Sequence, residues 1–260
     1  MGGNTREAGR TTASRVLALF AAFSSVDPVL ALTELAKASG LPIATTHRLA
    51  GELVDWGALE RRADGRYQVG LRLWHTGALA PAHRDLRSIA LPFMGDLYEA
   101  THENVQLAVR DGSRVLCLDK ISGRHSVDNV TKVAGWLPAH STGVGKIILA
   151  FSGADLLADV LAAGLTRYTP HTITLPGVLV DALRQVRESQ IAFSLEEMTI
   201  GAASVAAPVF GPDGELVASL ALVVRCTTNV RALAAAVRTA ALGVTRQLAQ
   251  SGVPPGGKVR

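Results

Sequence analysis

The stretch that decides the fold is residues 32–57, LTELAKASGLPIATTHRLAGELVDWG. It predicts two helices, the first capped by Thr33 and the second running from about Pro42 to Trp56, with a two-residue connection between them. Two helices joined by so short a turn are typical of a helix-turn-helix. Side chains at helical spacing predict the buried face of the second helix: Thr46, Leu49, Ala50, Leu53 and Val54.

The opposite face of the second helix carries groups that can read DNA. Its first turns hold the predicted DNA contacts: Ala44, Thr45, His47 and Arg48. Glu52 and Asp55, which phosphate would repel, lie in its second half, so the helix would enter a major groove by its N-terminal end. Arg48 is the candidate for bidentate contact with guanine, and the methyl groups of Ala44 or Thr45 for contact with thymine.

A hairpin follows this helix. Residues 58–62 and 66–69 read as strands on either side of Asp64-Gly65, a strong signal for a hairpin turn. Its arginines would press against the DNA backbone or into the minor groove, as a wing does: Arg61, Arg62 and Arg66. With a helix predicted over 14–24, the N-terminal part of the chain reads as a winged helix-turn-helix.

Composition excludes several classes of protein. Of the 260 residues, 48% are hydrophobic, which is typical of a folded globular chain rather than a disordered one. No apolar run approaches the ~20 residues that span a bilayer, and the polar start is not a secretory signal, so we expect a cytoplasmic protein with no membrane partner. The net charge of +4 permits contact with nucleic acid without requiring it.

The rest of the chain predicts an α+β domain with an antiparallel sheet. The expected strands are 105–109, 115–121, 202–210 and 216–224, and the expected helices are 71–79, 86–100, 143–151, 154–163, 176–189 and 230–250. The predicted domains are a flexible tail over 1–9, a DNA-binding domain over 10–72, a linker over 73–85, a second domain over 86–250 and a flexible tail over 251–260. The apolar faces of the helices at 71–79 and 86–100 offer surfaces for dimerisation.

The motifs that could suggest an enzyme are each incomplete in this sequence. The run from Gly143 to Lys146 lacks the first glycine and the final Ser or Thr of a P-loop, and it lacks the third glycine of a dinucleotide fingerprint. His140 and Ser141 have no nucleophile elbow around them, and Ser141 or Thr142 reads as a helix cap. We therefore expect no catalytic residues and no cofactor.

Three further features have structural interpretations. Glu196 and Glu197 would point to opposite faces of a strand or be solvated in a loop. Cys117 and Cys226 lie in strand-like runs and are expected to be small buried hydrophobes. The histidines show no metal-ligand spacing, so no metal site is predicted.

Over nearly its full length the sequence resembles the IclR family of bacterial transcription regulators. The matching segments are SRVL at 14–17, LTELA at 32–36, SGLP at 39–42, THRL at 46–49, GRYQVG at 65–70, GWLPAHSTGVGK at 135–146, EE at 196–197, AAPVF at 206–210 and DGE at 213–215. The resemblance implies a winged helix-turn-helix joined by a linker helix to a GAF-like effector-binding domain. It also implies a homodimer or dimer of dimers that binds double-stranded, palindromic operator DNA.

The resemblance also implies an effector site between the helix that begins at Gly143 and the sheet. The matching positions are Leu137, Gly143, Val144, Ala202, Ser204, Ala221 and Val223, with Ser194 as a further polar candidate. Gly143 and Val144 would offer free backbone N–H groups at a helix N-terminus. Because the matched sheet positions are mostly apolar, we expect a small-molecule effector with a carboxylate-like end and an apolar, for example aromatic, body.

The leading hypothesis is therefore an effector-controlled, sequence-specific DNA-binding regulator. The alternative is a GAF-like sensor or enzyme with a helical appendage that does not bind DNA. The arginines of the wing favour the first.

Overall fold

The computed structural model describes residues 11–24, 26–79, 81–123, 127 and 131–251, which belong to two compact units that divide between residues 80 and 81. This division lies inside the predicted linker. The tail predicted over 1–9 lies outside the described residues, as does the tail predicted over 251–260 except for Ser251, which ends the last helix. Each unit is described by itself.

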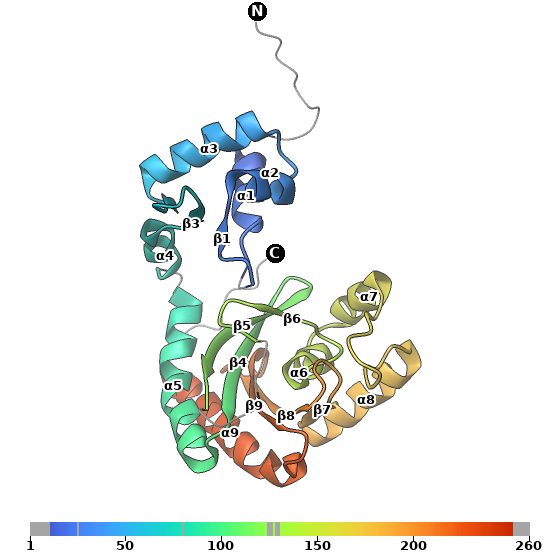
Figure 1. The fold of residues 1–260 in the computed structure, drawn as a ribbon. Helices are drawn as coiled ribbons and strands as arrows, with labels where there is room; N and C mark the ends of the chain where they lie inside the picture. Colours follow the sequence, from blue (N-terminus) through green and yellow to red (C-terminus); the bar gives the residue numbers. More distant parts are fainter. Residues whose placement is uncertain (1–10, 25, 80, 124–126, 128–130, 252–260) are drawn as a thin grey trace, which may run out of the picture. The chain divides into compact units, whose positions relative to one another are not determined.

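The first unit combines helices with a small antiparallel sheet (Figure 1). Its elements are α1 (Thr12–Ala21), β1 (Val29–Leu30), α2 (Leu32–Ser39), α3 (Ile43–Trp56), β2 (Leu59–Arg61), β3 (Tyr67–Val69) and α4 (Leu71–Gly77). The predicted hairpin is confirmed as β2 and β3, and β1 adds to β3 to give the order β1-β3-β2. The hairpin, residues 58–69, is called the wing below.

The helix-turn-helix is confirmed, with one correction at its start. Thr33 does not cap α2; the helix begins at Leu32, because the carboxylate of Glu34 accepts a 2.7 Å hydrogen bond from the Ala31 N–H. Gly40 ends α2 in the left-handed conformation, with φ at +65°, which glycine adopts without strain. The predicted inner face of α3 packs into the core of the unit, where Leu49 and Ala50 are fully buried beside Leu19 and Leu35.

The second unit is built on one curved antiparallel sheet. Its elements are α5 (Pro81–Thr101), β4 (Asn104–Asp111), β5 (Arg114–Ile121), β6 (Trp136–Leu137), α6 (Gly143–Phe151), α7 (Ala154–Ala163), α8 (Pro176–Ser189), β7 (Ala192–Leu195), β8 (Ala202–Phe210), β9 (Leu216–Arg225), a 3₁₀ turn (Val230–Leu233) and α9 (Ala234–Ser251). The strand order is β6-β5-β4-β9-β8-β7. The short edge strands β6 and β7 were not predicted.

Helices cover both faces of this sheet (Figure 1). One face packs against α5 and α9 through side chains such as Leu107, Val205 and Leu222. The other face packs against α6 through smaller side chains such as Ala206, and α8 packs against α6. Because successive residues of a strand point to opposite faces, each of the long strands contributes to both layers.

Two expectations for this unit are wrong. The apolar face of residues 86–100 is not free for dimerisation, because Leu86, Ala90 and Met94 are buried in the core between α5 and the sheet. Cys226 is exposed just past the end of β9, whereas Cys117 is buried on β5 as expected. The two thiols therefore lie in opposite environments.

Candidate DNA-binding surface and ligand pocket

The N-terminal turns of α3 present a solvent-facing surface. Ala44, His47 and Arg48 are exposed and Thr45 is half-buried. Thr46 points inward instead, and its hydroxyl donates to the Pro42 carbonyl at 3.1 Å. The four predicted DNA contacts on this helix therefore lie on the accessible side.

Arg48 already has a partner on its own helix. Its guanidinium donates to the Glu52 carboxylate, four residues on, at 2.5 Å. Both side chains are about 60% exposed, at 59% and 61%. Exposed ion pairs contribute only ~0–1 kcal/mol, so Arg48 can leave Glu52 for a base edge at little cost.

The arginines of the wing differ in what holds them. Arg62 pairs loosely with Asp64, at 3.5 Å between Nε and Oδ2. Arg61 lies over the Tyr67 ring and donates weakly to a carbonyl of the turn. Arg66 is tied into the body of the unit, since it donates to the Val29 carbonyl at 2.9 Å and to the Glu34 carboxylate at 3.3 Å.

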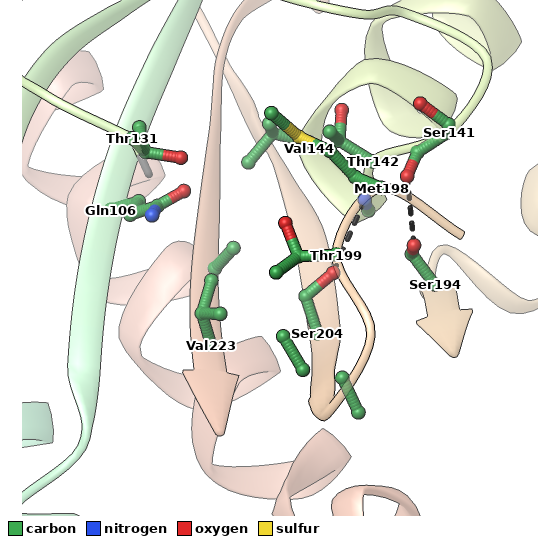
Figure 2. Close-up of a pocket in the computed structure, with 14 residues that line it drawn as sticks. Gln106, Thr131, Ser141, Thr142, Val144, Ser194, Met198, Thr199, Ser204 and Val223 are labelled. Atoms are coloured by element: carbon green, nitrogen blue, oxygen red, sulfur yellow. Dashed lines mark hydrogen bonds between the residues drawn. The ribbon is translucent and has the colours of Figure 1, made fainter. Parts of the chain in front are cut away.

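The second unit contains a pocket between α6, the sheet and the segment that follows β7 (Figure 2). Its empty volume, including the space open to solvent, is about 470 Å³. The described residues that line it carry no ionisable side chain: Gln106, Thr131, Ser141, Thr142, Gly143, Val144, Ser194, Met198, Thr199, Ala202, Ala203, Ser204, Ala221 and Val223.

All but one of the positions predicted for the effector line this pocket. The exception is Leu137, which lies on β6 at the far edge of the sheet. There β6 pairs with β5, and the Leu137 side chain is buried in the hydrophobic core. Its prediction as a lining residue is corrected accordingly.

The floor of the pocket is set by strand register. Ser194 on β7 lies opposite Ser204 on β8, which lies opposite Val223 on β9. In a neighbouring row, Gln106 on β4 lies opposite Ala221 on β9. Serine hydroxyls therefore stand at the β7 and β8 side of the floor, and methyl groups separate them from the Gln106 amide.

The N-terminus of α6 is less open than the sequence suggested. The Gly143 N–H is not free, because it donates to the Ser204 hydroxyl at 3.3 Å. Thr142 caps the helix as expected, accepting from the Gly145 N–H at 3.1 Å. The Ser194 hydroxyl is also occupied, as it donates to the Ser141 carbonyl at 2.9 Å (Figure 2).

Comparison with protein families assigns both units. The model described as "Bacterial transcriptional regulator IclR C-terminal" matches residues 79–246, and the "IclR helix-turn-helix domain" model matches residues 12–63. The chain belongs to the IclR family of bacterial transcriptional regulators. It combines the helix-turn-helix DNA-binding domain and the ligand-binding domain of that family, and the alternative of an appendage that does not bind DNA is set aside.

Individual IclR-family proteins align over most of their length. The chain is 32% identical to the acetate operon repressor of Salmonella typhimurium over 224 residues, which is 83% of this chain and 82% of the relative. It is 31% identical to the transcriptional repressor IclR of Escherichia coli over 197 residues, covering 74% and 72% of the two chains.

The match extends to solved structures. The crystal structure of an IclR homolog from Microbacterium hydrocarbonoxydans, complexed with 4-hydroxybenzoate, superposes with a TM-score of 0.86. The two sequences are 29% identical, and the superposition covers 92% of this chain and 99% of that one.

Two polar groups of the pocket in this IclR-family chain were missed by the sequence interpretation. Gln106 is 3% exposed and Ser141 is fully buried, yet the Gln106 Nε2 and the Ser141 Oγ have no hydrogen-bond partner among the described residues. A signal for Gln106 exists in the sequence, since it is the polar residue of the apolar run Val105–Val109. Buried polar groups are rarely left unpaired, and such exceptions indicate a ligand or an ordered water.

A buried ion pair supports the wall of the pocket. Lys146 on α6 donates to the Glu197 carboxylate at 2.5 Å and to the Phe193 carbonyl at 3.0 Å. Glu197 is therefore not solvated, which corrects the expectation for a loop residue. Burial lowers the pKa of Lys146, while the Glu197 carboxylate opposes that shift. The pair ties α6 to the segment that contributes Met198 and Thr199 to the pocket.

The described residues were also compared with the requirements of a catalytic histidine, a metal site and a membrane-spanning helix. The His140 ring contacts the Thr166 carbonyl at 2.9 Å through Nε2, so that nitrogen is already engaged. Within the described ranges, His, Cys, Asp and Glu side chains form no group of three that could hold a metal ion. None of the helices described there is long and apolar enough to cross a membrane.

Proposed function

We propose that this regulator binds its operator through α3 and the wing, and that a small molecule in the pocket of the second unit alters its affinity for that operator. The effector part of this proposal rests on two buried polar groups in the pocket, Gln106 Nε2 and Ser141 Oγ, which have no partner among the residues described by the structure. The exposed N-terminal face of α3 supports the operator half.

Base readout is assigned to the first turns of α3. Arg48 contacts guanine after leaving Glu52, and Ala44 and Thr45 offer methyl groups to thymine. His47 donates to a base edge or a phosphate. Because Ile43 and Ala44 carry no polar side-chain group, hydrogen-bonded readout depends on Thr45, His47 and Arg48.

Arg48→Ala tests this assignment. We expect it to weaken operator binding by ~1–3 kcal/mol and to relax the preference at one base pair. Binding to a panel of single-base operator variants, measured by fluorescence anisotropy, checks both. An unchanged preference at every base pair would contradict the orientation of α3.

The wing contacts phosphate through Arg61 and Arg62, whose present contacts are weak. Arg66 also faces solvent, but its bonds to β1 and α2 assign it mainly to positioning the wing. Arg61→Ala and Arg62→Ala should each lower the salt slope of DNA binding by about one. Arg66→Ala should lower the unfolding temperature of the chain with a smaller change in slope.

We assign a dimer or dimer of dimers to the DNA-bound form, because one winged helix reads only a short site and two read a palindrome. The exposed apolar side chains of α4 support a contact between copies: Leu71 is 71% and Trp74 is 68% exposed. Light scattering at micromolar concentration should give at least a dimer. A monomer that binds its operator tightly would contradict this assignment.

The effector is assigned to the partly apolar, carboxylate-like class. The acid end would face the α6 N-terminus, where the Ser141 and Ser204 hydroxyls can donate to it and the helix dipole favours an anion. The apolar body would lie on Ala221 and Val223. The 4-hydroxybenzoate bound by the Microbacterium homolog supports an acid of this kind.

Calorimetry with aromatic acids and short keto acids tests this class. The wild type should bind benzoate-like acids more tightly than pyruvate or glyoxylate, because the methyl groups of the floor gain contact only with an apolar body. Val223→Ser adds a hydroxyl group to the floor of the pocket and should therefore reduce the difference in affinity between aromatic acids and keto acids. Tighter binding of a keto acid than of any aromatic acid by the wild type would contradict the assignment.

A further inference from the structure

We propose that Gln106 forms a second polar subsite, opposite the α6 end of the pocket, and that it selects aromatic acids with a hydroxyl group para to the carboxylate. This inference rests on the proposed function, because it assumes that the effector occupies this pocket. It adds a residue that reads the far end of the ligand and narrows the ligand class to para-hydroxylated rings.

The strand neighbours of Gln106 in the sheet offer its side-chain nitrogen no acceptor. On the pocket face its register neighbour on β9 is Ala221, and the next residue across the sheet is Ala206 on β8. On the other side lies Lys120 of β5, whose ammonium group donates to the Thr131 carbonyl at 3.1 Å. Among the residues that the structure describes, the buried Gln106 Nε2 has no hydrogen-bond partner, and it lines the pocket, so a ligand group there can complete it.

The acid end has its own donors on the opposite wall. The buried Ser141 hydroxyl has no partner within the described ranges, and the Ser204 hydroxyl accepts from the Gly143 N–H and keeps its own proton to donate. Figure 2 shows Gln106 and Thr131 on one side of the pocket and Ser141 and Ser194 on the other, with Val223 and Ser204 between them. A ligand that meets both ends therefore carries its two polar groups at opposite ends of a flat apolar body.

The chemistry of an amide decides which second group fits. A side-chain amide donates through nitrogen and accepts through oxygen, and a phenolic hydroxyl can pair with either. A hydrogen or methyl group at the para position of the ligand displaces water from the Gln106 amide without replacing its hydrogen bond. Leaving a buried polar group unpaired in this way lowers the affinity. A para substituent points directly away from the carboxylate, whereas an ortho substituent turns back toward it.

The test compares 4-hydroxybenzoate, benzoate and 4-methylbenzoate on the full chain by calorimetry. The wild type should prefer 4-hydroxybenzoate over both others by about tenfold or more, the ratio expected for one buried hydrogen bond. In Gln106→Leu this preference should disappear, and 4-methylbenzoate should bind at least as tightly as 4-hydroxybenzoate. Gln185→Leu, an exposed glutamine on α8, is the matched control and should keep the wild-type order.

A second readout needs no ligand. Replacing the side-chain amide, whose buried nitrogen has no partner among the described residues, by an apolar group of similar size removes the desolvation penalty of that nitrogen, so Gln106→Leu should unfold at a higher temperature than the wild type. Should Gln106→Leu not fold, Gln106→Asn retains the amide, shortens its reach and should reduce the preference for 4-hydroxybenzoate over benzoate.

The outcomes separate the two proposals. Equal affinities of the wild type for benzoate and 4-hydroxybenzoate, or an unchanged ratio in the Gln106 variants, would overturn the subsite while leaving the aromatic-acid effector intact. Failure of all three acids to bind the wild type would overturn the effector class and the subsite together.

Discussion

On α3 and the wing, exposed arginines are paired with nearby carboxylates: Arg48 with Glu52, and Arg62 with Asp64. In the pocket of the second unit, no ionisable side chain lines the described wall, and two buried polar groups have no partner in the part of the chain that the structure describes. Exposed pairs exchange partners at a cost of ~0–1 kcal/mol, whereas a buried unpaired group carries a penalty of ~1–3 kcal/mol. The first arrangement suits exchange for DNA phosphate, and the second suits a ligand that completes missing hydrogen bonds.

The largest effect should come from breaking the buried pair beside the pocket. Lys146→Met leaves the Glu197 carboxylate buried without its cation, and breaking such a pair typically destabilises a protein by ~3–5 kcal/mol. Urea denaturation measures this as a drop in the free energy of unfolding. The double variant with Glu197→Gln should recover much of the loss, since it removes the uncompensated charge.

The matched control is an exposed pair of the same unit. Arg184 donates to Asp181 on α8 at 2.7 Å, and both side chains are about two-thirds exposed, at 66% and 65%. Arg184→Met should lower the free energy of unfolding by less than ~1 kcal/mol. If Lys146→Met were as mild as Arg184→Met, the contrast between buried and exposed polar groups would not hold.

A smaller effect is expected at the exposed pair on α3. Glu52→Gln releases Arg48 and removes a negative charge from the DNA-facing helix, while changing the free energy of unfolding by less than ~1 kcal/mol. DNA affinity should rise for operator and random sequence alike, as measured by anisotropy at fixed salt. Weaker operator binding by Glu52→Gln would mean that the ion pair holds Arg48 in its reading position.

The smallest effect on the molecule is expected from alkylation of its two thiols, Cys117 and Cys226. Burial raises the pKa of Cys117 to about 11, whereas Cys226 is exposed. An alkylating reagent at pH 8 should therefore modify the folded chain once, at Cys226, because reactivity requires an accessible thiolate. Mass spectrometry should show no addition to Cys226→Ser, and two additions to the wild type only in denaturant.

Much of the fold could be predicted from the sequence, because its long elements have strong local patterns. The helices α3, α6 and α8 and the Asp-Gly hairpins follow from periodicity and turn residues alone. The short edge strands β1, β6 and β7 could not be predicted. They span only two to four residues and are defined by pairing with partners distant in sequence.

The functional residues of the pocket were also harder to predict where their role depends on contacts between distant parts of the chain. The sequence interpretation located half of the residues that line the pocket, but it did not single out Gln106 or Ser141. Their significance depends on the absence of a neighbouring partner, which is a property of the folded structure and not of local sequence. Glu197 was misjudged for a related reason, because its partner Lys146 lies 51 residues away along the chain.

The central claim is that filling the pocket changes the affinity for operator DNA. Its most direct test is a thermodynamic cycle with 4-hydroxybenzoate: operator affinity by anisotropy with and without the acid, and acid affinity by calorimetry with and without operator. We expect the same factor in both directions, about 5–150-fold, because coupling between two binding sites is reciprocal. Operator affinity that stays unchanged at a saturating concentration of acid would contradict the account.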